Sequence, residues 1–336
     1  MFSRFKFIAA RVYLGFALLL FIVPIVTALT GQDFYLDLLT RVLILAIAAL
    51  SLNLMVGFGG IISLGHAAFI GIGAYCVGIP AYYDIHNGFV HLGLAIVCSA
   101  VFALITGAIC LRTRGLYFIM ITLAFAQMLY FTFVSLDEYG ADDGLVIYQR
   151  SEFSGLLNIE NAVTLYYTVL AVLLIFFGLL HRLVQARYGR VIIGSKHNEQ
   201  RMQALGYNTY KYKLVCYVIS GTMAGVAGFF LGNFTNYISP EMMDWTHSSE
   251  LLFMIVIGGT GGLFSPIIGA AVFLLLEEFL SGITVFWHLI FGLILIALVL
   301  FGKGGLHGLL LRWQDKHHKS HPYGQRDEKM ANGAGP

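Results

Sequence analysis

Long apolar runs are the feature that most constrains how this chain of 336 residues can fold. A helix needs about 20 apolar residues to cross a bilayer, and most of the chain divides into runs near that length. Only 11% of the residues are charged, against about 25% in a soluble domain. We therefore predict an all-α integral membrane protein with about ten transmembrane helices. The expected spans are 12–29, 39–57, 61–80, 89–111, 116–136, 162–181, 214–232, 249–262, 266–281 and 284–301.

Charged residues segregate across these spans and indicate their orientation. The inner segments would be 1–11, 58–60, 112–115, 182–213, 263–265 and 302–336. They contain all 20 Lys and Arg residues except Arg41 and Arg150, as the positive-inside rule requires. The acids other than Glu199 and those of the C-terminal tail fall on the outer side. We predict that both termini are cytoplasmic, that 12–29 is an uncleaved span because it is too long for a signal peptide, and that the polar tail 312–336 is disordered.

The sequence carries no motif for ATP hydrolysis or another catalytic activity that could supply energy. It has no G-x-x-x-x-G-K-[ST], HExxH or GxSxG pattern, and its four cysteines lack the spacing of a metal cluster or a disulfide framework. Its spans carry no charge at mid-membrane, where ion-coupled carriers often place one, although backbone carbonyls can also hold sodium. We therefore predict a membrane protein that is not an enzyme, has no catalytic residue, metal site or bound cofactor, and takes its energy from a partner.

The cytoplasmic loop 182–213 is the segment best placed to receive that energy. Residues 189–205 can form one or two short helices, with Gly206 as the C-cap. Such helices could fit a groove on a partner protein. Alternatively, the loop is a basic juxtamembrane segment that sets the topology and contacts acidic lipid. The residues alone leave both interpretations open.

Several sequence blocks, in the right order, resemble one family. The block GRVIIGSKHNEQRMQALG (189–206) and the residues after it, up to 240, are similar to permease subunits of branched-chain amino-acid ABC importers of the LivM type. In that family a G-R pair opens the loop, and an N-E-x-x-A-x-A-L-G-type motif forms the coupling helix that docks on the ATPase. The matching positions are Gly189, Arg190, Asn198, Glu199, Ala204, Leu205 and Gly206. Where the family usually has small residues after the glutamate, this chain has Gln200, Arg201 and Met202.

The resemblance covers about 38–311 and implies a fold, a function and partners. It implies an ABC importer permease fold over residues 1–311 and a translocation pathway for leucine, isoleucine, valine or similar small neutral solutes. The implied partners are two ATP-binding subunits that use ATP and magnesium, a second related permease, a periplasmic or extracellular solute-binding protein and membrane lipid, but no nucleic acid. The implied location is the bacterial inner membrane. A urea or amide permease of this type and an autonomous carrier or channel are the alternatives.

The glycine-rich stretch NLMVGFGGIISLGHAAFIGIGAY (53–75) contains the candidate pathway residues. Glycine weakens a helix but permits close helix packing in lipid, and Gly221, Gly225, Gly228 and Gly232 form a similar row of small residues on the seventh span. By analogy with interrupted transporter helices, we expect glycine breaks at 57–60 and 258–262 to border the inner gate, the first as a tight reversal. The gate candidates are Gly59 and Gly261. The polar candidates, which either line the pathway or bond to neighbouring helices, are Asn53, Ser63, His66 and Gln127.

Overall fold

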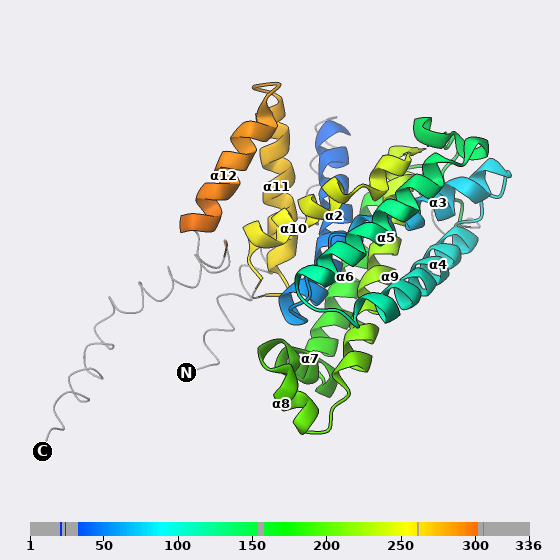
Figure 1. Ribbon diagram of the computed structural model, residues 1–336. Helices are drawn as coiled ribbons and strands as arrows, with labels where there is room; N and C mark the ends of the chain where they lie inside the picture. The colour runs from blue at the N-terminus through cyan, green and yellow to red at the C-terminus, as the bar shows by residue number, and fades with distance from the viewer. Residues whose placement is uncertain are drawn as a thin grey trace, which may run out of the picture.

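Figure 1 shows the computed structural model, a bundle of helices with a separate pair of short helices at one end. The structure describes residues 33–153, 158–260 and 262–301, together with residues 21, 24 and 305. Apart from two positions, the predicted first span, 12–29, lies outside the described residues, as does the predicted tail, 312–336.

The described chain is helical apart from its connecting segments and one short β-ribbon. Its first half contains α2 (Asp33–Asn53), the π-helix η1 (Leu54–Phe58), α3 (His66–Tyr82), α4 (Gly88–Cys110), α5 (Leu116–Val134), the 3-10 turns η2 (Asp137–Tyr139) and η3 (Ala141–Asp143), and strand β1 (Leu145–Val146). Its second half contains α6 (Ala162–Gln185), α7 (Arg187–His197), α8 (Glu199–Ala204), α9 (Thr209–Thr235), β2 (Tyr237–Ile238), the 3-10 turn η4 (Pro240–Met243), α10 (Trp245–Gly258), α11 (Ser265–Ser281) and α12 (Trp287–Phe301). The two strands pair antiparallel, with Leu145 opposite Ile238.

Five helical segments within the described residues are long and apolar enough to cross a membrane. They are Phe34–Phe58, which joins α2 to η1, and the helices α4, α5, α6 and α9. The other apolar helices are shorter: α3 and α11 have 17 residues each, α12 has 15 and α10 has 14. An all-α fold with several helices long and apolar enough to span a membrane is therefore confirmed, and the count of ten spans stays a prediction.

Helix α9 occupies the middle of the bundle, packed against α2, α3 and α4 (Figure 1). A Cβ atom built at Gly228 would touch the backbone of Ile70 in α3, and one built at Gly73 of α3 would touch the backbone carbonyl of Gly225. The two helices therefore meet backbone to backbone. Such contact supplies the van der Waals packing that holds helices together in lipid. The predicted row of small residues on α9 is a packing face.

Two breaks interrupt the helices, as the glycines predicted, but the first break is longer than expected. The first helix ends in η1, the chain is not helical from 59 to 65, and α3 begins only at His66. The predicted tight reversal at 58–60, with a span starting at residue 61, is therefore wrong. Gly60 has a φ of +68°, a left-handed conformation that ends a helix and that glycine tolerates best. The second break covers 259–264, between α10 and α11.

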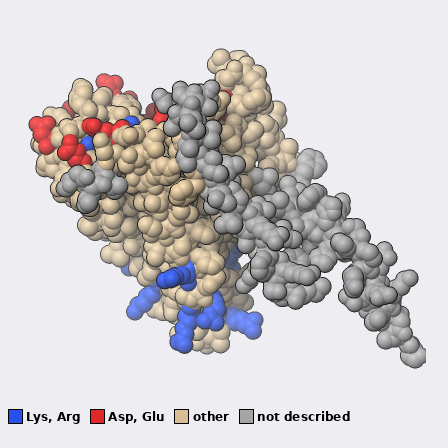
Figure 2. Space-filling view, turned by 180° about the vertical axis from the view of Figure 1, so that it is seen from behind, with Lys and Arg blue, Asp and Glu red and all other residues tan. Residues whose placement is uncertain are grey.

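Charge separates along the long axis of the bundle. Figure 2 shows Lys and Arg gathered at the end that carries α7 and α8, and most visible Asp and Glu at the opposite end. Arg41, an exception in the sequence pattern, has a partner: its guanidinium lies 3.3 Å from the carboxylate of Glu277, which joins α2 to α11. The ion pair lowers the cost of placing a cation in an apolar helix.

Candidate functional site

Helices α7 and α8 form a compact angled pair that projects from the basic end of the bundle (Figure 1). Asn198 separates them and caps α8, because its side-chain oxygen accepts a hydrogen bond of 2.9 Å from the backbone N–H of Arg201. Gly206, with a φ of +85°, ends α8. The backbone N–H of Tyr207 donates to the carbonyl of Met202 at 3.2 Å, the longer bond of a Schellman motif. The two predicted short helices and the glycine cap are confirmed.

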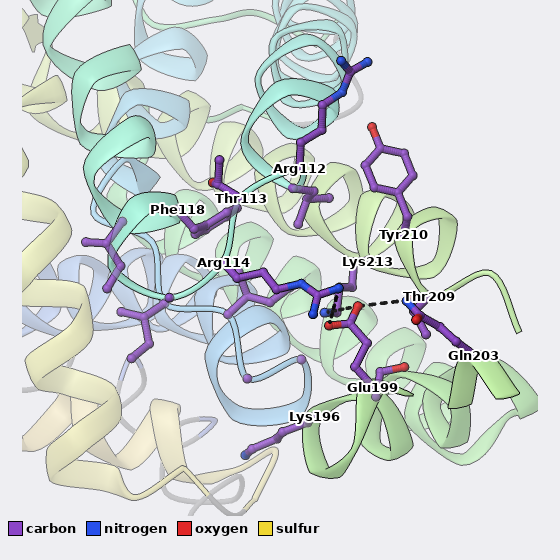
Figure 3. Close-up of a pocket in the computed structure, with 18 residues that line it drawn as sticks. Arg112, Thr113, Arg114, Phe118, Lys196, Glu199, Gln203, Thr209, Tyr210 and Lys213 are labelled. Atoms are coloured by element: carbon purple, nitrogen blue, oxygen red, sulfur yellow. Dashed lines mark hydrogen bonds and ion pairs between the residues drawn. The ribbon is translucent and has the colours of Figure 1, made fainter. Parts of the chain in front are cut away.

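Glu199 turns inward from the first turn of α8 and holds that helix to the bundle. Its carboxylate accepts a 3.0 Å hydrogen bond from the Thr209 hydroxyl and lies 2.8 Å from Nζ of Lys213, both in α9. Arg114, in the turn between α4 and α5, approaches to 3.5 Å (Figure 3). The carboxylate therefore ties three segments together.

The electrostatic setting keeps Glu199 ionised. Partial burial raises the pKa of its carboxyl group. The hydrogen bond and charge of Lys213, the hydrogen bond from Thr209 and the charge of Arg114 lower the pKa by more than burial raises it, so the pKa lies below the ordinary value. Hydrogen bonds to the charged form stabilise that form. Glu199 is therefore an internal anchor of α8.

The remaining predicted coupling residues divide between packing and exposure. Gly189 is buried where α6 turns into α7, and a Cβ there would strike the backbone of Val184. Arg190, Ala204, Leu205 and Gly206 are exposed. Leu205 keeps 65% of its surface exposed. The outer surface of α8 is thus the part free to meet another protein.

Lys196 contacts the bundle at a second place. Its Nζ donates a 2.6 Å hydrogen bond to the backbone carbonyl of Gly57, in the π-helix that ends α2. In the sequence, Lys196 is only one of many basic residues predicted on the inner side. Nothing local signals its partner, because 139 positions separate the two residues.

A pocket of about 450 Å³ lies where the first break, the α4–α5 turn and the α7–α8 pair meet (Figure 3). It is lined by Gly59, Gly60, Ile61, Ile62, Leu111, Arg112, Thr113, Arg114, Gly115, Phe118, Ile119, Ser195, Lys196, Glu199, Gln203, Thr209, Tyr210 and Lys213. Three of its cations already face a described partner: Arg114 and Lys213 face Glu199, and Lys196 faces a backbone carbonyl. Among the described residues, no three His, Cys, Asp or Glu side chains gather as they would around a metal ion.

The gate candidates lie partly together. Asn53 is buried, and its Nδ2 donates to the carbonyl of Gly262 at 3.1 Å, which joins the first break to the second. A Cβ built at Gly57 would lie 3.2 Å from the carbonyl oxygen of Thr260, in the same second break. Gly59 lines the pocket beside them, and Gly261 lies outside the described residues. The two predicted breaks are therefore neighbours in space.

The other polar candidates lie elsewhere. Ser63 and His66 are fully buried. The Ser63 hydroxyl accepts a hydrogen bond from the Gly65 N–H at 3.2 Å, and Nε2 of His66 lies 2.9 Å from the hydroxyl of Ser51 in α2. Gln127 of α5 donates to Asp244 at 3.0 Å, far from the breaks in sequence and separate from the pocket. The His66 contact joins two helices and the Gln127 contact joins a helix to a connecting segment, whereas the Ser63 contact is local to the first break.

Comparison with known proteins identifies the family. The family model described as branched-chain amino acid transport system / permease component matches residues 34–300. The chain belongs to this family. Two similar relatives are the high-affinity branched-chain amino acid transport system permease proteins LivM of Salmonella typhimurium (strain LT2) and of Escherichia coli (strain K12). Each is 25% identical over 293 residues, which cover 80% of this chain and 69% of the relative.

A probable branched-chain amino acid transport permease protein LivH, from Methanocaldococcus jannaschii, is 28% identical over 154 residues, 43% of this chain and 48% of that protein. No solved structure gives a significant match. The family resemblance drawn from the sequence is therefore confirmed: the chain belongs to the branched-chain amino acid ABC permease family, and a transport permease is not a catalytic subunit.

Proposed function

We propose that this permease forms the translocation pathway of an ABC importer for leucine, isoleucine, valine or similar small neutral solutes. The observation that carries the proposal is the α7–α8 pair, which projects from the basic end and is anchored inward by Glu199. Its exposed surface, around Leu205, is free for an ATPase subunit. The basic end is then cytoplasmic by the positive-inside rule, and the membrane is the bacterial inner membrane.

The permease works as one part of a larger assembly. Two ATP-binding subunits, which use ATP and magnesium, would dock at the α7–α8 pair from the cytoplasm. A second related permease would complete the pore, and a soluble binding protein would deliver solute at the acidic end. Family membership supports this arrangement, because the relatives are described as components of transport systems. The chain itself binds no cofactor in this scheme, and residues 312–336 form a cytoplasmic tail.

An apolar pathway suits an apolar cargo. A neutral amino acid with a hydrocarbon side chain needs no strong charge along its route, because the binding protein can supply the affinity. The transport systems named for the LivM relatives favour branched-chain amino acids as the cargo. A urea or amide cargo is the second candidate within the same mechanism.

Uptake by the reconstituted complex tests the proposal. Vesicles containing the permease, its second permease and its ATPases should accumulate radiolabelled leucine only with the binding protein outside and ATP on the ATPase side. Labelled urea is the alternative cargo. Uptake that proceeds without ATP or without the ATPases would make the chain an autonomous carrier or channel, and the proposal would fail.

The docking surface can be tested in the same preparation. Proline cannot adopt the φ of +85° found at Gly206, so Gly206→Pro should disrupt the end of α8 and release the ATPases while the permease stays in the membrane. Gly206→Asn is the matched control, because asparagine tolerates left-handed conformations. Co-purification measures the association, and full retention by Gly206→Pro would refute the docking role.

A further inference from the structure

Lys196 caps a helix that it does not belong to. It lies in the last turn of α7 and donates from Nζ to the carbonyl oxygen of Gly57, 2.6 Å away. The last carbonyls of a helix have no partner within it, and a helix C-terminus carries partial negative charge. A lysine ammonium is therefore well suited to the end of α2 and η1.

The lysine stem also lies on the first break. A Cβ built at Gly60 would approach Cγ of Lys196 to 2.7 Å and Cβ of Lys196 to 3.4 Å. The break and the α7 helix thus touch over the length of one side chain. The left-handed φ of Gly60 and the space taken by the lysine both require glycine there.

The residues that Lys196 reaches also contact the second break. The turn that contains Gly57 approaches the carbonyl of Thr260, and Asn53, one turn earlier, donates to the carbonyl of Gly262. A continuous set of contacts therefore runs from α7, through the ammonium of Lys196 and the end of α2, to the segment between α10 and α11. The pocket cations Arg114 and Lys213 face Glu199 instead, so they do not duplicate this contact.

We infer that Lys196 is a positioning residue that makes the two glycine breaks move with the α7–α8 pair. When the ATPases displace α8, α7 and Lys196 would move with it. Through its hydrogen bond to Gly57, Lys196 would then move the end of α2 and the second break, which contacts that end. The inference rests on the proposed function, because it needs an ATPase to move the loop. It differs from docking, since Lys196 would affect how ATP hydrolysis is used and not whether the ATPase binds.

The first test separates hydrolysis from transport in the complete complex. Lys196→Met keeps much of the apolar stem but removes the ammonium, so the ATPases should still bind and hydrolyse ATP. The amount of solute moved per ATP should fall about fivefold or more, the size of an ordinary coupling between sites. Arg187→Met removes one exposed cation from the other end of α7 and should leave the ratio unchanged. An unchanged ratio in Lys196→Met, or equal losses of hydrolysis and transport, would overturn the inference.

The second test replaces the lysine contact with a covalent bond. Because the built Cβ atom of residue 60 lies 3.4 Å from Cβ of Lys196, near the disulfide range, a Gly60→Cys/Lys196→Cys pair should cross-link in a chain without its own cysteines. With the cysteines reduced, little solute should be transported per ATP hydrolysed. Oxidation should restore the amount transported per ATP, and a reductant should reverse that effect. Gly60→Cys alone measures the combined cost of the left-handed position and of the contact with the Lys196 stem.

A cross-linked pair that stays uncoupled would show that α7 must separate from the break, and the inference would be wrong. If the unaltered complex itself showed no ATP-dependent uptake, the proposed function would fail instead. The two failures are therefore distinguishable.

Discussion

At the scale of single residues, Glu199 shows how α8 is held in place. The family resemblance assigns it to the coupling helix, and its carboxylate faces Lys213 and Thr209 of α9. A hydrogen bond to a charged group contributes about 1.5–3 kcal/mol to the stability of the fold. In the proposed docking the glutamate would act through the position of α8, while Arg201 and Leu205 on the same loop are exposed.

Glu199→Gln should loosen α8 without unfolding the bundle. Loss of the charge weakens the contact with Lys213, so trypsin should cleave after the exposed Arg201 about tenfold faster, as a loss of about 1.5 kcal/mol implies. Glu241→Gln, at an exposed acid of η4, is the control and should not change the rate. Equal cleavage of all three proteins would contradict the anchoring role.

The same contact has a predictable pH dependence. The folded protein lowers the pKa of Glu199 from its ordinary value of 4.5, so its stabilisation is complete above that value and is lost as pH falls through the folded pKa. The difference between the unaltered protein and Glu199→Gln should therefore be constant at neutral pH and disappear only in acid. Hydrogen exchange of the α8 amides can measure it.

At the scale of helices, local signals were sufficient for some elements and not for others. Gly206 marks the end of α8 locally, so the sequence predicted one or two short helices ending there, and the structure has two, separated at Asn198. The length of the first break was not predictable in this way, because it depends on what packs there, including the stem of Lys196 against Gly60. The Lys196–Gly57 contact was missed for the same reason: it is set by the fold and not by neighbouring residues.

The α3–α9 crossing offers a test at this scale. Gly228→Leu would force a side chain into the backbone of Ile70, and overpacking of this kind costs about 1–3 kcal/mol. The melting temperature of the purified protein in detergent should fall clearly. Gly178→Leu in α6 is the matched control, because nothing lies within 4 Å of a Cβ at that position. A similar melting temperature for both variants would contradict close packing of α3 on α9.

At the scale of the whole molecule, the opposite charges of its two ends predict how the protein is oriented in the membrane. Sequence and structure agree that basic residues gather at one end, which also bears α7 and α8, and acidic residues at the other. In the proposed importer this separation would place the loop in the cytoplasm, where the ATPases would lie, since cytoplasmic segments are enriched in Lys and Arg. The orientation thus links the charge pattern to the direction in which energy enters.

Labelling of single cysteines in intact cells tests that orientation. Tyr148, in the acidic end, is 97% exposed and Leu205, on α8, is 65% exposed, so a cysteine at either site should react readily. Tyr148→Cys should be labelled by a membrane-impermeant maleimide from outside, whereas Leu205→Cys should react only after the membrane is permeabilised. The parent, with Cys76, Cys98, Cys110 and Cys216 replaced by alanine, gives the background. The reverse labelling pattern would show that α7 and α8 lie outside the cell, where no cytoplasmic ATPase could reach them. The orientation predicted from the charge separation would then be wrong.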